Sequence, residues 1–142
     1  MSIKPNQLLP SLKKDPRPLV WINGDEPLLV QESADSVRKF CRDSGFEERE
    51  ILHVDRRFDW ATFLDTTSNL SLFASRKLIE LRLDSARLED PGKTALQAYA
   101  DAPNPDYLVL LTSPRIEPGA QNTRWFKQLA ASMWIVQIWP VS

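Results

Sequence analysis

The chain has 142 residues, of which 42% are hydrophobic and 26% charged, a composition that fits one globular domain and excludes a disordered segment. Its 18 Lys and Arg residues nearly balance 19 Asp and Glu residues, whereas a domain that binds nucleic acid by itself usually carries a basic excess. A single cysteine excludes an internal disulfide, and no apolar stretch reaches the roughly 18 residues of a membrane span, so we expect a cytoplasmic protein with no membrane contact.

The expected elements alternate between helices and short strands. Apolar runs with a period of two predict strands, and apolar stripes at spacings of three and four predict helices. In chain order we expect a short leading helix at 5–14, interrupted by Pro10; a strand at 18–22; a helix from Pro27 to about Gly45; a strand at 50–54; a helix that begins at Asp59; a strand at 76–83; a helix at 91–100; a strand at 106–112; a helix at 121–131; and a strand at 134–139.

The helix that begins near Pro27 has the clearest signals. Asp25 or Glu26 can cap it, and proline is tolerated in a first turn. Gly45 is placed to end it. One face is an apolar stripe that we expect to face the core, made of Val30, Ala34, Val37 and Cys41.

Strands that alternate with helices predict an α/β fold in which a five-stranded, mostly parallel sheet is flanked by helices. The run at 106–112 is apolar on both faces, as a central parallel strand should be. In the run at 76–83, Glu80 and Arg82 alternate with the apolar positions. The chain ends directly after its fifth strand, which suggests a single domain, residues 1–142, cut from a longer protein with further C-terminal domains.

A parallel sheet invites a nucleotide-binding interpretation, but the motifs for it are missing. The first strand–helix loop, 23–26, has one glycine and two acids instead of a glycine-rich phosphate loop. The letters of Gly92-Lys93-Thr94 match the end of that motif, but Arg87 stands where its first glycine belongs. The strand at 106–112 is not followed by an acidic pair that could hold magnesium.

No other catalytic set is present. His53 is the only histidine and falls in a predicted strand, so we expect a structural role for it, and Cys41 should be a buried structural thiol. We therefore predict no catalytic residue, no metal and no cofactor. Two other functions remain open: a small or degenerate nucleotide-binding enzyme domain on the same fold, and a receiver-like signalling domain using Asn23 and Asp25.

The connection between the helix at 59 and the strand at 76 breaks the pattern, because three large apolar residues stand among polar ones. They are Leu70, Leu72 and Phe73. One interpretation is that they fold back into the core. The other is an exposed docking patch, since a Leu-Phe pair is a natural anchor for a pocket on a partner.

The order of several motifs resembles the delta-subunit family of the bacterial DNA polymerase III clamp loader. The resemblance covers most of residues 18–139, although no single motif is decisive. It is carried by Gly24-Asp25-Glu26-Pro27-Leu28-Leu29-Val30-Gln31-Glu32-Ser33, Val37-Arg38, Gly45-Phe46-Glu47-Glu48, Asp59-Trp60, Ser71-Leu72-Phe73-Ala74-Ser75-Arg76 and Trp125-Phe126.

The resemblance implies an AAA+-like, P-loop-like domain without a nucleotide site, which binds the sliding clamp (the beta subunit) and promotes its opening during DNA replication. It implies that Leu70, Ser71, Leu72 and Phe73 contact the clamp, with Leu72 and Phe73 entering an apolar pocket. Clamp-binding segments often carry a glutamine before this pair, where Ser68 stands here. Further domains would join the other clamp-loader subunits, and DNA would be contacted only indirectly.

Overall fold

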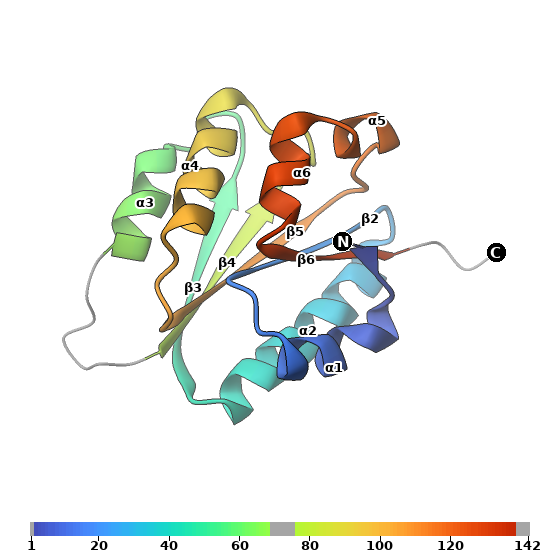
Figure 1. The fold of residues 1–142 in the computed structure, drawn as a ribbon, viewed down its shortest axis with the longest axis vertical. Coiled ribbons are helices and arrows are strands. Elements are labelled where there is room, and N and C mark those ends of the chain that lie inside the picture. The colour runs from blue at the N-terminus through green and yellow to red at the C-terminus, as the bar shows by residue number, and fades with distance from the viewer. Residues whose placement is uncertain (1, 69–75, 139–142) are drawn as a thin grey trace.

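The computed structural model describes residues 2–68 and 76–138 and contains a six-stranded sheet in which every pair of neighbouring strands is parallel (Figure 1). The strand order is β1-β6-β2-β5-β4-β3. The strands are β1 (Ser2–Ile3), β2 (Leu19–Gly24), β3 (Phe46–Val54), β4 (Arg76–Leu83), β5 (Tyr107–Ser113) and β6 (Met133–Ile138).

Helices cover both faces of the sheet, with α1 and α2 on one side and α3, α4 and α6 on the other (Figure 1). Each side has its own apolar core, because successive side chains of a strand point to opposite faces. The helices are η1 (Pro5–Gln7), α1 (Leu8–Lys14), α2 (Pro27–Asp43), α3 (Trp60–Ser68), α4 (Asp90–Asp101), α5 (Pro118–Gln121) and α6 (Arg124–Ala130).

The predicted α/β fold with a parallel sheet is confirmed, and all five predicted strands are present with small shifts at their ends. The sixth strand, β1, was not expected. It is two residues long and pairs with β6 at the edge of the sheet, so it is too short to show a period of two.

Two local predictions about helices were wrong. Pro10 does not interrupt the leading helix, because it is the third residue of α1, where its missing N–H would have no partner inside the helix. Neither Asp25 nor Glu26 caps α2 with its side chain: Glu26 is at the N-cap without such a bond, and Asp25 Oδ1 accepts from the N–H of Arg115 at 3.2 Å. The predicted end of α2 is correct, since Gly45 has a φ of 88° just beyond it.

The predicted alternation in β4 is confirmed, but its polar face is not solvated. Leu81 packs in the core under α4, whereas Glu80 points to the α2 side and is only 1% exposed. Arg38 of α2 donates to Glu80 from Nε at 2.6 Å, which explains how a carboxylate can be buried there. Both faces of β4 are therefore covered at Glu80 and Leu81. One faces an apolar core, and on the other a buried carboxylate is paired with an arginine.

Candidate functional site

The α3–β4 connection, in which the sequence places its candidate contact residues, is held at both described ends. At the end of α3, Phe63 and Thr67 are buried. At the start of β4, the Arg76 guanidinium lies 4.1 Å from the ring centroid of Phe46 and donates to the Ser44 carbonyl at 2.8 Å. β4 begins at the amino edge of the parallel sheet, whereas α3 lies on the face that α4 and α6 also cover (Figure 1).

Leu70, Ser71, Leu72 and Phe73 themselves lie outside the described residues. The choice between a core position and an exposed patch therefore stays a prediction for them. Ser68, which stands at the position of the family's glutamine, is the last residue of α3 and is exposed; its hydroxyl donates to the Asp65 carbonyl at 3.2 Å.

The opposite, carboxyl edge of the sheet is where folds of this class usually bind ligands, and here the first loop is tied to its own neighbours. Asn23 is fully buried; its amide donates to the Val136 carbonyl at 3.2 Å and accepts from the Ile116 N–H at 3.1 Å. A Cβ on Gly24 would come within 2.8 Å of Ile138 Cβ. The polar groups that might have met a phosphate instead join β2 to β6 and to the segment after β5.

The Gly92-Lys93-Thr94 triplet has a packing explanation. Gly92 is buried in the first turn of α4, and a Cβ there would come within 2.8 Å of the Trp60 indole ring. Trp60 is in turn held edge-to-face between Phe58 and Phe63. Lys93 lies 5.2 Å from the ring centroid of Trp125, so the triplet serves the contact between helices.

We predict that Gly92→Ala destabilises the domain by about 1 kcal/mol. Alanine gains up to about 1 kcal/mol of helix propensity, but forcing a methyl against an immobilised indole typically costs about 1–3 kcal/mol. Thermal unfolding checks this, with Gly119→Ala as the matched control because no atom lies within 4 Å of a Cβ there. An unfolding temperature equal to or above that of the unchanged chain would show that Trp60 moves aside freely.

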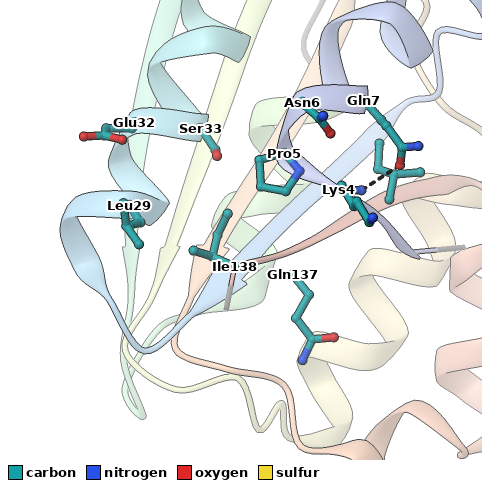
Figure 2. A pocket seen from close by; sticks show the side chains of 10 residues that line it. Lys4, Pro5, Asn6, Gln7, Leu29, Glu32, Ser33, Gln137 and Ile138 are labelled. Carbon is teal, nitrogen blue, oxygen red and sulfur yellow. Dashed lines mark hydrogen bonds between the residues drawn. The ribbon is translucent and has the colours of Figure 1, made fainter. Parts of the chain in front are cut away.

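Two of the pockets that the described residues form at the surface lack the chemistry of a phosphate site. The first, of about 650 Å³, opens between the chain before α1, the start of α2 and the end of β6. Figure 2 shows Leu29 and Glu32 of α2 on one side and Pro5 on the other, with Ile138 between them. Beside this pocket the Lys4 N–H donates to Gln7 Oε1 at 2.9 Å (Figure 2). The lining consists mainly of apolar side chains and side-chain amides.

The second pocket, of about 1010 Å³, lies beyond the carboxyl ends of β3 and β4. Its lining mixes both signs of charge: Arg56, Arg57 and Arg87 alternate with Asp55, Asp84 and Glu89. A phosphate would meet as many acids as bases there, which disfavours it as a nucleotide site. The described residues hold no group of three or more His, Cys, Asp or Glu that could bind a metal ion.

A buried charge cluster under α2 is the feature that the sequence did not reveal. Glu80 accepts from Arg38, from Arg49 Nε at 2.9 Å and from Arg82 at 3.4 Å. Burial alone would raise the pKa of Glu80, but the hydrogen bonds and charges of Arg38 and Arg49 outweigh it and hold that pKa below its ordinary value. The one hint of this cluster in the sequence is that Glu80 is the only acidic residue of the strand at 76–83.

Comparison with known proteins shows the family of this chain. The family described as DNA polymerase III, delta subunit, matches residues 21–138, which is most of the chain. The chain belongs to this family. Within it, the chain is 30% identical over 126 residues to the DNA polymerase III subunit delta of Escherichia coli strain K12, covering 89% of this chain. It is 27% identical over 124 residues to that of Haemophilus influenzae, covering 87% of this chain.

This delta-family chain spans 37% and 36% of the length of those two relatives. Among solved structures, the DNA clamp loader delta protein of Bacillus subtilis superposes with a TM-score of 0.69 at 14% identity, over 94% of this chain and 42% of that one. At this identity the likeness concerns the fold alone, and it agrees with the AAA+-like class. The resemblance inferred from the ordered motifs is confirmed.

The family assignment and the first loop lead to a prediction for ATP. We expect no saturable binding of Mg-ATP in the low micromolar range, because Asn23 is engaged by the sheet and two acids follow it. Calorimetric titration of the chain with Mg-ATP tests this. Micromolar binding, or ATP turnover that Lys93→Ala abolishes, would contradict it.

The two candidate reactive side chains differ in environment. Cys41 is a buried thiol on α2, as predicted, and burial raises its pKa to about 12 against the opposing charge of Arg76. His53 lies in β3, as predicted, and its side chain is exposed. β3 is the outermost strand of the described sheet, and the structural role expected for this histidine stays a prediction.

We predict that Cys41 reacts slowly with thiol reagents in the folded chain. Only the thiolate is nucleophilic, and both burial and the raised pKa keep the thiol protonated and out of reach at neutral pH. Labelling with a thiol-specific probe should be at least about a hundredfold slower in buffer than in denaturant. Equal rates in the two conditions would mean that α2 opens readily.

Proposed function

We propose that this domain binds the sliding clamp and promotes its opening as part of a bacterial clamp loader in the cytoplasm. Its clamp-contact residues would be Leu70, Ser71, Leu72 and Phe73. The observation that carries the proposal is the family match over residues 21–138, which spans the α3–β4 connection. In this role the domain acts by contact and carries no catalytic residue of its own.

The surroundings of the connection support this role. A contact segment transmits force to a partner only if its ends are fixed to a rigid body. Here Phe63 anchors α3 in the core, and Arg76 anchors β4 through Phe46 and Ser44. Both attachment points of the proposed contact segment therefore belong to the folded body.

The relatives' names support a clamp-loader role as well. The Bacillus subtilis neighbour is a DNA clamp loader delta protein, and the two curated relatives are subunits of DNA polymerase III. As part of a clamp loader, this domain would have the clamp and the other loader subunits as its partners. DNA would be reached through the clamp, since the net charge of −1 gives this chain little affinity for phosphates.

Clamp binding and clamp opening are tested separately. For binding, the chain is passed over the immobilised clamp of the same organism, and saturable binding is expected. For opening, the clamp is loaded on nicked circular DNA, and the chain should release it without ATP. An absence of binding contradicts the whole proposal, whereas binding without release contradicts only the opening.

A further inference from the structure

Within residues 2–68 and 76–138, one part of the sheet surface has exposed side chains where no helix packs. On the α2 side, the core under α1 and α2 lies mainly over β6, β2 and β5, and beyond it Arg49, Ile51 and His53 of β3 lie beside Arg82 of β4. We call these four residues the open β3–β4 face. Ile51 is 37% exposed and is among the few large apolar side chains at the described surface.

The residues of this face point the same way because the strands are parallel and in register. Ile51 is paired with Glu80, and His53 with Arg82. Since paired residues of neighbouring strands project to the same side, the two arginines, the isoleucine and the histidine form one continuous patch. Among the described strands β3 pairs only with β4 and is the outermost, so its other edge borders the patch.

Positive charge on this face exceeds what its carboxylate can satisfy. Glu80 accepts from three guanidinium groups, and Arg38 takes the best geometry, with Nε at 2.6 Å and an additional pair with Asp35. Arg49 also contacts both oxygens of Glu80, from Nε at 2.9 Å and from Nη2 at 3.2 Å, and Arg82 reaches the same carboxylate at 3.4 Å. The Arg49 and Arg82 side chains are 43% and 35% exposed, and the buried Nε of Arg82 has no hydrogen-bond partner among the described residues.

We propose that the open β3–β4 face docks another subunit of the clamp loader, which presents a carboxylate to Arg49 and Arg82 and an apolar side chain to Ile51. A carboxylate is the planar, two-oxygen group that guanidinium groups bind most strongly in proteins. It would balance the second and third cations of the cluster, whose side chains are 43% and 35% exposed. This inference rests on the proposed clamp-loader function and gives this domain a second contact, distinct from the clamp.

A protein partner fits this face better than nucleic acid. A phosphate backbone would need a broad basic surface, whereas the arginines of this face surround the carboxylate of Glu80. Ile51 would gain nothing from a phosphate, whereas it can pack against an apolar side chain of a protein. The free edge of β3 offers main-chain groups to a partner segment in addition.

The test removes the two positive charges and compares assembly with clamp binding. The double variant Arg49→Gln/Arg82→Gln is mixed with the other purified clamp-loader subunits of the same organism, and association is measured by sedimentation velocity at several salt concentrations. We expect association about tenfold weaker or more, with a smaller salt dependence, and unchanged binding to the clamp. The control Arg124→Gln/Lys127→Gln removes the same charge from exposed positions on α6 and should assemble as the unchanged chain does.

A second variant covers the case in which the double variant folds poorly. Ile51→Ser replaces a partly exposed side chain, so the variant should unfold near the temperature of the unchanged chain and still assemble more weakly with the other subunits. Unchanged assembly for a folded Ile51→Ser or double variant overturns the proposal. The proposal is also overturned if the variants assemble normally with the other subunits but bind single-stranded DNA, or associate with themselves, more weakly than the unchanged chain does. If the unchanged chain does not bind the clamp, the result contradicts the proposed function instead.

Discussion

Replacing Leu72 and Phe73 together by alanine is expected to weaken binding of the chain to the sliding clamp on the order of a hundredfold or more. A central apolar anchor typically loses about 2 kcal/mol or more when it is truncated, and each 1.4 kcal/mol corresponds to about a factor of ten. Equilibrium binding to the immobilised clamp measures this directly. The control Leu28→Ala shortens another apolar side chain, one that is 72% exposed at the start of α2, and should bind as the unchanged chain does.

The same double variant distinguishes an anchor from a core position. If Leu72 and Phe73 face solvent, the free energy of unfolding should change by less than about 1 kcal/mol. If they fold into the core, each replacement should cost about 2–5 kcal/mol of unfolding free energy. A variant that unfolds far earlier supports the core position, and one that stays folded and binds the clamp normally rules out the anchor.

Replacing Glu80 by alanine is expected to destabilise the domain by about 3–5 kcal/mol. Removing one partner of a buried ion pair leaves the other charge without compensation, and the Arg38 side chain is only 9% exposed. For a chain of this size that loss lowers the unfolding temperature on the order of 10 °C or more. The matched control is Glu50→Ala: its partner Lys77 lies 3.4 Å away in a half-exposed pair, which should contribute less than about 1 kcal/mol.

The free energy of unfolding should depend on pH because of the lowered pKa of Glu80. Because the folded pKa of Glu80 is lowered, its contribution is fully present above the ordinary carboxyl pKa of about 4.3 and is lost as the pH falls through the folded value. Chemical unfolding between pH 3 and pH 7 should therefore show a decline at the acid end that Glu80→Gln reduces. An identical decline in this variant would assign acid sensitivity to other carboxylates.

Much of the fold follows from local signals that packing reinforces. The stripe on α2, the glycine at its end and the apolar run of β5 each agree with the final environment, which is why the parallel α/β class could be predicted. β1 could not be, because two residues carry no period and Ser2 and Ile3 become a strand only through pairing with β6. Pro10 was misjudged because its effect depends on where the helix begins.

The site was predictable to a different degree. The ordered motifs predicted the family correctly, since a set of spacings over residues 18–139 is more specific than any one of them. The cluster around Glu80 was not visible, because its members come from α2, β3 and β4 and meet only in the folded sheet. The exposure of His53 was missed for the same reason: it depends on which strand is outermost, and strand order is not written in any local pattern.

We propose that the α3–β4 connection is the surface that binds the clamp. Hydrogen exchange of the backbone amides, measured with and without the clamp of the same organism, tests it most directly. We predict slower exchange at residues 69–76 on clamp addition and no change around the carboxyl-edge pocket at 54–60 and 84–91. Protection confined to that pocket, or no protection anywhere in the presence of saturating clamp, would contradict the account.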